Sequence, residues 1–397
     1  MHGTARGAAH LLLWGLVVLL ASGCAREEGL YFGLDMQGRN PDDFRILRRD
    51  DETARERKEV AIEGRQQIAT LLWAGFGDPN DPYVLPESGL DLGLLKLAAG
   101  PVRSDQYGAH TGLFRQHCMH CHGLNGDGAG PTALFLNPYP RDFRKGVFKF
   151  TSTGEGMRAT TADLKRTLRE GIPGTAMPSF GLLPDAEVNA LVEYVKYLAL
   201  RGQLEELLFA YLDAEEELPA DYDSLAAEVS SLAAQWEAAE NGVIEPDQQS
   251  LPDVASAADL QASIDRGREI FRDAEKAQCV KCHGIAALGD GGDEQLFDDW
   301  NKNKPANDSP EIAWWNLPRQ ELQPRNLRLG IYRGGRRPID LYYRIFAGIK
   351  GTPMPAAGKV LTPEQIWDLI NYVKSLPYEH DTPHAVAEPQ LAERSRL

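Results

Sequence analysis

An internal duplication constrains the fold of this chain of 397 residues more than any other sequence feature. Each copy carries a Cys-x-x-Cys-His motif, at 118–122 and at 279–283. Each then carries a Gly-Thr-x-Met-Pro sequence, at 174–178 and at 351–355. Because these elements keep the same order, we predict two domains of one fold rather than a single continuous core.

Each copy closes with an amphipathic helix. These helices follow Pro184 and Pro363, and an acidic residue comes directly after each proline. Proline in the first turn and acids beside it favour the start of a helix. Apolar residues then recur at helical spacing, whereas strand-like alternation is scarce in both copies. The predicted fold class is therefore all-α.

The first residues have the layout of an export signal. An apolar run from Leu11 to Ala21 follows Arg6, and Leu20–Cys24 resembles a bacterial lipobox. The run is shorter than the ~20 residues that span a bilayer as a helix, which favours a cleaved leader over a permanent anchor. A lipidated Cys24 would hold the mature chain to a membrane. The alternatives are plain signal cleavage, leaving a free thiol, and an uncleaved leader.

Six segments are expected along the chain. They are a lipoprotein signal peptide (1–23), an N-terminal extension (24–104), a first domain (105–202), an acidic helical connector (203–263), a second domain (264–377) and a C-terminal tail (378–397). The extension contains a predicted helix from Asp51 to Leu72 and no recognisable chemistry.

The formal net charge of −16 lies in one stretch, because Gln203 to Asp265 hold sixteen acidic residues and no Lys or Arg. Such charge runs are commonly solvated faces, and the alternative is that this one steers a basic partner. No nucleic-acid partner is expected.

The Cys-x-x-Cys-His motifs are attachment signatures of c-type haem. Two such cysteines reach both vinyl groups of one porphyrin, and the next histidine lies under the iron. The rival interpretations are a zinc site, a thioredoxin-like dithiol and a structural disulfide, but the two motifs are too far apart for a compact zinc module and neither lies in a βαβ pattern. We therefore predict two covalently attached haem c groups, on Cys118, Cys121 and His122 and on Cys279, Cys282 and His283.

The sixth iron ligands are predicted from the six methionines. Two lie upstream of both motifs, and Met119 lies inside the first motif. Met177 and Met354 occupy equivalent positions, whereas Met157 has no counterpart. A single loop methionine is commonly core filler, but the repeated Gly-Thr-x-Met-Pro favours Met177 and Met354 as ligands. His/Met ligation raises the haem potential and suits an electron carrier.

These motifs resemble the class I cytochrome c family over 107–202 and 264–377. The resemblance implies small helical domains in which an N-terminal helix with a glycine and an aromatic residue crosses the C-terminal helix. In the second copy Gly267 and Phe271 fit that helix, with Tyr372 or Trp367 opposite. The candidates in the first copy are Phe114 and Tyr194, with His110 where the glycine is expected.

The same resemblance implies that the carbonyl of Pro131 orients His122. The second copy has no proline after Gly291–Gly292, so the sequence does not identify what orients His283. A Pro-Arg pair lies between the motifs of each copy. Its arginines, Arg141 and Arg325, are candidate partners of haem propionates because guanidinium matches carboxylate bidentately. The alternative for both is a solvated surface arginine.

In tandem, the two copies resemble bacterial dihaem cytochromes c and the c-haem subunits of respiratory oxidases. The implied function is electron transfer, not catalysis, between a redox donor and a redox acceptor of a bacterial respiratory chain. The implied partners are a terminal oxidase or a quinol-oxidising complex, and the implied location is the periplasmic or another extracytoplasmic face of a membrane. The alternative is a dihaem peroxidase-like enzyme with one open iron, against which the symmetry of Met177 and Met354 argues.

Overall fold

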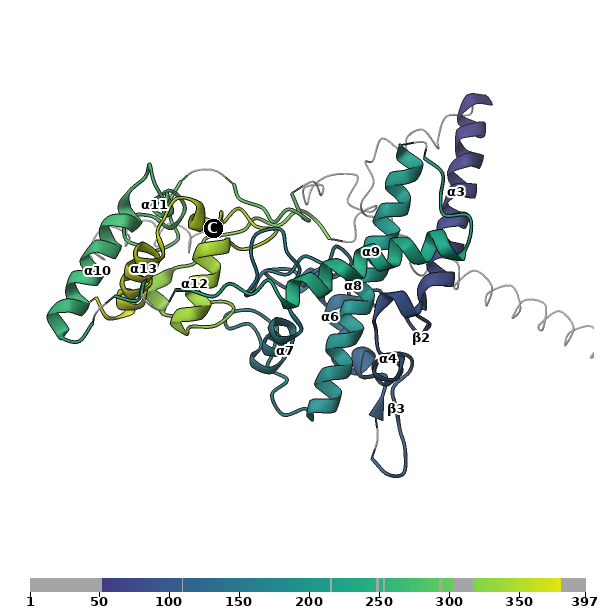
Figure 1. The fold of residues 1–397 in the computed structure, drawn as a ribbon, viewed down its shortest axis with the longest axis horizontal. Coiled ribbons are helices and arrows are strands. Elements are labelled where there is room, and N and C mark those ends of the chain that lie inside the picture. The colour runs from purple at the N-terminus through teal and green to yellow at the C-terminus, as the bar shows by residue number, and fades with distance from the viewer. Residues whose placement is uncertain are drawn as a thin grey trace, which may run out of the picture. The chain divides into compact units, whose positions relative to one another are not determined.

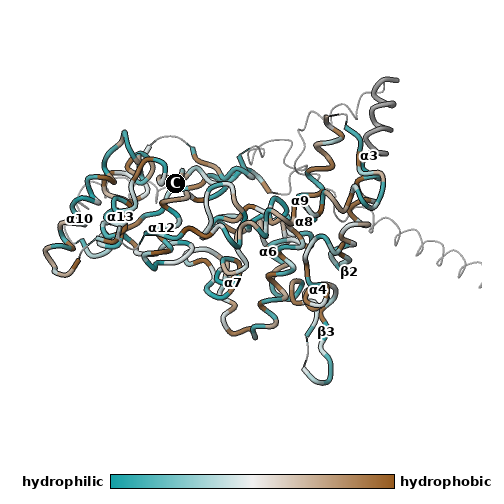
Figure 2. The backbone as a smooth tube through the Cα atoms, viewed as in Figure 1, coloured by the Kyte–Doolittle hydropathy of each residue, from teal (hydrophilic) through white to brown (hydrophobic). Residues whose placement is uncertain are grey.

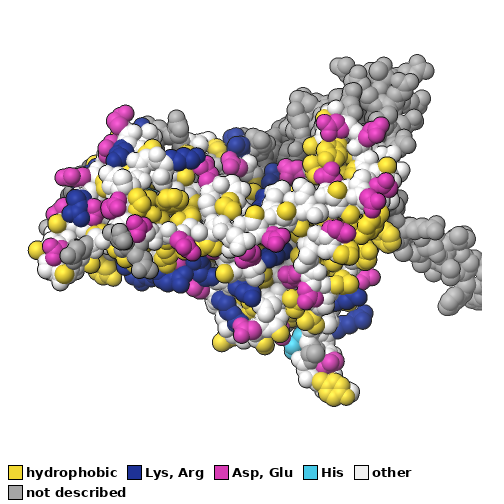
Figure 3. All heavy atoms as spheres, viewed as in Figure 1, with side chains coloured by type: hydrophobic (Ala, Val, Ile, Leu, Met, Phe, Trp, Pro, Cys, Tyr) yellow, Lys and Arg dark blue, Asp and Glu magenta, His cyan; other side chains and the backbone are white. Residues whose placement is uncertain are grey.

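The structure is a computed structural model that describes residues 52–108, 110–214, 216–247, 250–252, 254–292, 295–302 and 317–379. The predicted signal peptide, Cys24 and nearly all of the predicted tail lie outside these residues. Within them no helix is both long and apolar enough to cross a membrane. The visible face carries acidic and basic side chains among apolar ones (Figure 3).

The described chain is helical with two very short sheets, which confirms the predicted all-α class (Figure 1). The α-helices are α3 (Glu52–Phe76), α4 (Leu92–Ala98), α5 (Leu113–His117), α6 (Met119–His122), α7 (Thr161–Glu170), α8 (Asp185–Asp213), α9 (Tyr222–Glu240), α10 (Ala257–Arg272), α11 (Cys279–His283), α12 (Pro338–Ala347) and α13 (Pro363–Ser375). The strands pair antiparallel as β1 (Gly77–Asp78) with β2 (Asp81–Pro82) and β3 (Arg103–Ser104) with β4 (His110–Thr111). The 3-10 helices are η2 (Pro86–Ser88), η3 (Ala133–Phe135), η6 (Leu327–Leu329), η7 (Ala357–Lys359) and η8 (Leu376–Tyr378).

The chain divides into two compact units. Unit 1 comprises Met1–Pro131, Asp142–Gly146 and Glu193–Ala233, and unit 2 comprises Thr132–Arg141, Val147–Val192 and Ala234–Leu397. Each unit is described by itself. The first Cys-x-x-Cys-His motif belongs to unit 1, whereas both methionine loops and the second motif belong to unit 2.

In unit 1 the helix of the N-terminal extension, α3, packs on α8 and α9. Ile68 and Phe76 lie on α3 and are fully buried. A Cβ added at Gly75 of α3 would lie 3.7 Å from Leu204 of α8 and 4.0 Å from Val229 of α9. Figure 2 shows hydrophobic positions along α8 and α9. The helix predicted over 51–72 is therefore present as α3, and its apolar residues Ile68 and Leu72 are buried.

Helix α8 runs unbroken from the first repeat into the acidic connector. Tyr197 on α8 donates its hydroxyl to the carbonyl of Phe76 at 2.9 Å, and Tyr194 donates to the carbonyl of Pro79. Burial raises the pKa of both phenols, so they remain neutral donors. These hydrogen bonds fix the end of α3 to α8.

In unit 2, α10 crosses α13 with backbone in contact with backbone. A Cβ added at Gly267 would lie 2.1 Å from the carbonyl oxygen of Asp368, so a larger residue does not fit. The rings of Phe271 and Tyr372 meet edge to face with centroids 5.4 Å apart. Trp367, the other candidate, instead donates to Ser250 at 3.0 Å. The predicted helix crossing is confirmed, with Tyr372 as the partner.

The first repeat replaces the long N-terminal helix with the five-residue α5. Gly112 precedes α5 in the left-handed region, with φ 75°, and His110 lies in strand β4. The ring contact is kept, because Phe114 and Tyr194 lie 4.9 Å apart. The departure at His110 therefore marks a real difference between the repeats.

The second repeat has a longer segment between its haem motif and its Pro-Arg pair, and this segment holds unit 2 together. Gln320 in this segment accepts a hydrogen bond from the backbone of Tyr139 at 3.1 Å and donates to the carbonyl of Leu136 at 2.9 Å. Trp300 lies 6.2 Å from the ring of Tyr139. The first repeat's Leu136–Tyr139 segment is therefore packed on the second repeat.

Candidate haem-binding sites

The first motif lies on the short helix α6 in unit 1. Cys118 and His122 are buried, and Cys121 is half-buried. The imidazole of His122 stacks on the ring of Phe143, with centroids 4.3 Å apart. Burial, with a smaller effect from Cys121, raises the pKa of Cys118 to about 12. The motif therefore presents a neutral Cys118 thiol and a histidine that stacks on an aromatic ring.

The second motif lies on α11 in unit 2, where the orientation of His283 is fixed by a backbone carbonyl. Nδ1 of His283 donates to the carbonyl oxygen of Arg325 at 3.1 Å. Burial lowers the pKa of His283, which favours the neutral ring. A neutral histidine with hydrogen on Nδ1 leaves Nε2 to bind iron. The group that orients His283, which the sequence did not identify, is thus the backbone of Arg325.

The loops after the two motifs repeat one hydrogen-bond pattern. The amides of Gly128 and Gly289 donate to the carbonyls of His122 and His283 at 3.0 and 2.9 Å. Those of Gly130 and Gly291 donate to Cys121 and Cys282 at 3.1 and 3.2 Å. Pro131 and Gly292 come next and are therefore equivalent. The role expected of the Pro131 carbonyl stays a prediction.

The Pro-Arg pairs also keep equivalent positions. The amide of Phe143 donates to Gly126, and that of Leu327 donates to Ala287, at 2.7 and 2.9 Å. Arg141 and Arg325 each precede these residues by two positions. Residues that are equivalent in the sequence alignment of the two repeats therefore make equivalent backbone hydrogen bonds.

Both methionine loops have the same internal hydrogen bonds. Ile172 donates its amide to the carbonyl of Met177, and Ile349 to that of Met354, both at 3.1 Å. The hydroxyl of the loop threonine accepts from the methionine amide at 3.1 Å in the first loop and 3.2 Å in the second. Met177 and Met354 are thus held in equivalent positions by equivalent contacts.

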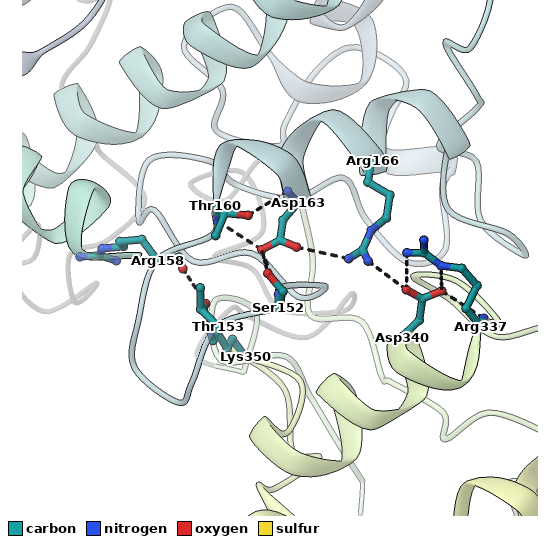
Figure 4. A network of polar contacts seen from close by, with 9 residues as sticks. All are labelled: Ser152, Thr153, Arg158, Thr160, Asp163, Arg166, Arg337, Asp340 and Lys350. Atoms are coloured by element: carbon teal, nitrogen blue, oxygen red, sulfur yellow. Dashed lines mark hydrogen bonds and ion pairs between the residues drawn. The ribbon is translucent and has the colours of Figure 1, made fainter. Parts of the chain in front are cut away.

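Each methionine loop follows a helix that begins with an aspartate at its third position. Asp163 on α7 receives hydrogen bonds from Ser152 at 2.9 and 3.0 Å, and Asp340 on α12 receives them from Arg337 (Figure 4). Arg166 joins the two, donating to Asp163 at 3.4 Å and to Asp340 at 2.9 Å. These ion pairs fix α7 and α12, and so both loops, within unit 2.

Met157, the alternative ligand, has a different environment. Its side chain packs on Gly242, which follows α9, and its carbonyl accepts from Lys350 at 2.7 Å. It lies outside the repeated loop geometry. Met177 as the ligand of the first haem stays a prediction.

Arg141 and Arg325 are both half-buried. Nε of Arg141 donates to the carbonyl of Val147 at 2.6 Å. The guanidinium of Arg325 would lie 2.4 Å from a Cβ added at Gly174. Their role as partners of haem propionates stays a prediction.

The donor set fits haem c better than the rival interpretations. Burial raises the pKa of Cys279 to about 11, opposite to the lowered pKa of a reactive dithiol. No group of three or more His, Cys, Asp or Glu residues suited to a metal ion occurs in the described ranges. Each repeat instead offers two cysteines, a histidine and a methionine, which is the residue set that holds haem c.

The helical repeats and their paired haem motifs define a tandem class I c-type cytochrome. Residues 106–195 match the family model described as cytochrome c oxidase, cbb3-type, subunit III, and residues 264–377 match the model described as cytochrome c. The chain therefore contains two cytochrome c domains, which bind haem c and transfer electrons.

Among curated proteins, the cbb3-type cytochrome c oxidase subunit FixP of Sinorhizobium medicae (strain WSM419) is 29% identical over 128 residues. The match covers 32% of this chain and 35% of that subunit, so it spans about a third of the relative's length. A solved structure, the Kuenenia stuttgartiensis reducing HAO-like protein complex Kustc0457/Kustc0458, covers 67% of this chain and 94% of its own at 24% identity and a TM-score of 0.45. That similarity is too low to support an inference about function.

Proposed function

We propose that the protein is a dihaem electron carrier or electron-transfer subunit. In each repeat a histidine and a methionine are the two axial ligands of the haem iron. The observation that carries this proposal is the matching hydrogen bonding of the two methionine loops. The haem ligands and attachment residues are Cys118, Cys121, His122 and Met177 for the first haem and Cys279, Cys282, His283 and Met354 for the second.

A haem c bound in this way supplies one-electron chemistry without an open iron position. The protein's part is to hold the histidine tautomer, to keep the methionine loop rigid and to exclude water. His283 and the Met354 loop have the geometry for these tasks in unit 2. Met177 and Met354 lie in loops with the same hydrogen bonds, which argues against a peroxidase-like enzyme, because such an enzyme requires one haem iron with an open coordination position.

The partners are proposed from the chemistry and from the likeness to the FixP subunit. A redox donor and an acceptor of a bacterial respiratory chain, such as a terminal oxidase or a quinol-oxidising complex, fit a carrier of this kind. Haem c attachment suits the periplasmic or another extracytoplasmic face. Lipidation of Cys24 would supply the membrane anchor, and Cys24→Ser should then release the protein from membranes with both haems intact.

Methionine substitution tests the ligand assignment. Met177→Ala and Met354→Ala should each remove about half of the sulfur-to-iron charge-transfer absorption and let one haem per chain bind carbon monoxide. Met157→Ala is the matched control and should leave the absorption unchanged. Loss of absorption only in the Met157 variant would contradict the assignment of Met177.

Electron transfer and peroxidase activity are separated by one pair of measurements. The reduced protein should be reoxidised quickly by membranes that contain a cytochrome c-oxidising terminal oxidase and only slowly by hydrogen peroxide. Rapid and sustained peroxide turnover by the unmutated protein would favour the enzyme instead.

A further inference from the structure

The two methionine loops differ in the side chains that can hold them in place. Both loops have the same closing hydrogen bonds. Within the repeated pattern, however, the first loop has Pro173 and Ala176 where the second has Lys350 and Pro353. Of these four side chains, only that of Lys350 can donate hydrogen bonds. The second loop can therefore be anchored by a side chain at a position where the first loop cannot.

The side chain of Lys350 makes this anchor within unit 2. Its Nζ donates to Oγ1 of Thr153 and to the carbonyl oxygen of Met157, both at 2.7 Å. Figure 4 shows Lys350 beside Thr153. Burial lowers the pKa of Lys350 to about 8, against the charge of Asp163, so the amine is mostly charged at pH 7. Hydrogen bonds from a charged donor are the stronger ones, so the contact holds the side chain firmly.

The residues that accept these hydrogen bonds belong to a turn of the first repeat, residues 152–158, which is called the acceptor turn below. Thr153 is fully buried and pairs with Val243 in an isolated β-bridge. Its hydroxyl donates to the carbonyl of Arg158 at 2.7 Å. A hydroxyl has one hydrogen to donate and two lone pairs to accept, so this bond and the one from Lys350 are compatible. The acceptor turn is therefore a fixed support for the lysine.

The anchor is connected to Met354 by a short path along the loop. The residue before Lys350, Ile349, donates its amide to the carbonyl of Met354 at 3.1 Å. The residue after it, Gly351, accepts from the amide of Asp299 at 3.1 Å. Loss of the lysine contacts should therefore leave the loop attached through Gly351 but should let the segment that holds Met354 move.

We propose that Lys350 is a positioning residue for Met354, which it keeps in place for the second haem iron by binding the acceptor turn. The inference rests on the proposed function, because that function makes Met354 an axial ligand. It makes the ligation of the second haem depend on a turn of the first repeat. Pro173 cannot make the equivalent contact, so the ligation of the first haem does not share this dependence.

The test measures how readily imidazole displaces Met354 from the ferric iron of the full-length, haem-loaded protein at pH 7. A Met177→Ala background leaves Met354 as the source of the sulfur-to-iron absorption, whose loss then reports displacement at the second haem alone. Lys350→Leu removes both hydrogen bonds and adds no sulfur. It should lower the imidazole concentration for half displacement about tenfold, the order expected for lost hydrogen bonds from a charged group.

Substitutions in the acceptor turn separate the hydrogen bond from the charge. Thr153→Val removes one acceptor without changing any charge and should act in the same direction as Lys350→Leu. The double variant should show less than the combined effect of the two, because both remove the same contact. Thr153→Ser keeps the hydroxyl and should restore the parental value.

Lys359 offers a matched control. It is an exposed lysine of the second repeat whose ion pair is with Glu155 of the same acceptor turn. Exposed ion pairs contribute little, so Lys359→Leu should leave the displacement of Met354 unchanged. In a Met354→Ala background, Lys350→Leu should likewise leave the displacement of Met177 unchanged.

Two results would overturn the proposal. The first is an unchanged displacement of Met354 in both Lys350→Leu and Thr153→Val. The second is an equally large effect of Lys350→Leu on Met177, which would indicate a general destabilisation of unit 2 and not positioning of one ligand. If the Met177→Ala protein has no sulfur-to-iron absorption before imidazole is added, Met354 is not a ligand and the proposed function fails instead.

Discussion

His283 donates its Nδ1 hydrogen to the carbonyl oxygen of Arg325 at 3.1 Å, so an arginine that faces the first methionine loop also orients the second proximal histidine. A backbone carbonyl does this without a charge of its own and fixes the ring tautomer. Because the contact uses the backbone, Arg325 side-chain variants should keep the orientation of His283. This separates the charge of Arg325 from its positioning role.

The ion pairs that join α7 to α12 are expected to stabilise unit 2. Asp340 is 1% exposed and accepts from Arg166 at 2.9 Å and from Arg337 at 2.7 Å. Asp340→Asn should lower the free energy of unfolding by roughly 2 kcal/mol, since buried hydrogen bonds to a charged group are weakened. Chemical denaturation measures the change. Asp185 pairs with Arg169 and its side chain is 93% exposed, so Asp185→Asn should cost less than about 1 kcal/mol. Equal losses in the two variants would contradict this account.

Lys350 should make stability rise with pH. Burial lowers its pKa from 10.5 to about 8; Asp163 opposes this shift and Arg158 adds to it. Between these values the unfolded chain binds the proton and the folded chain does not, so the free energy of unfolding rises with pH. The effect is at most about 1.4 kcal/mol per pH unit for one group. Lys350→Met should therefore show a smaller rise between pH 8 and pH 10.5, and equal slopes in both proteins would refute the prediction.

Gly267→Ala should disrupt the crossing of α10 and α13, because the new Cβ would lie 2.1 Å from a backbone carbonyl of α13. The expected loss of stability is on the order of 1–3 kcal/mol, as for other overpacked cores. Thermal unfolding followed by absorption of the second haem would report it. A variant with unchanged stability would show that the helices can move apart freely.

Much of the fold could be predicted from the sequence because the two repeats can be aligned with each other. Local sequence predicts the Cys-x-x-Cys-His motifs and the helices that begin after proline. Gly267 reflects a single close contact, with the backbone of Asp368. The break in the pattern at His110 also marked a real structural difference, the short α5. Met177 and Met354 share a loop geometry that their sequence context had indicated.

The long-range contacts were beyond the sequence. Every residue has a backbone carbonyl, so the residue type at position 325 does not indicate that this carbonyl orients His283. The position of Arg141 beside Gly351 of the other repeat depends on how the repeats pack, which the sequence of neither repeat encodes alone. Gln320 lies in the segment that is longer in the second repeat than in the first, so the first repeat offered no equivalent residue for comparison. The packing of α3 on α8 had one sequence signal, the apolar face of the extension helix.

The haem count of the purified full-length protein tests the central claim most directly. Intact-mass analysis under denaturing conditions should show a mass increase equal to two haem groups per chain, because each motif supplies two thioether bonds. Cys279→Ala/Cys282→Ala should reduce this to one haem and halve the haem stain on a denaturing gel. A single haem in the unmutated protein, or no change in the variant, would contradict the dihaem assignment.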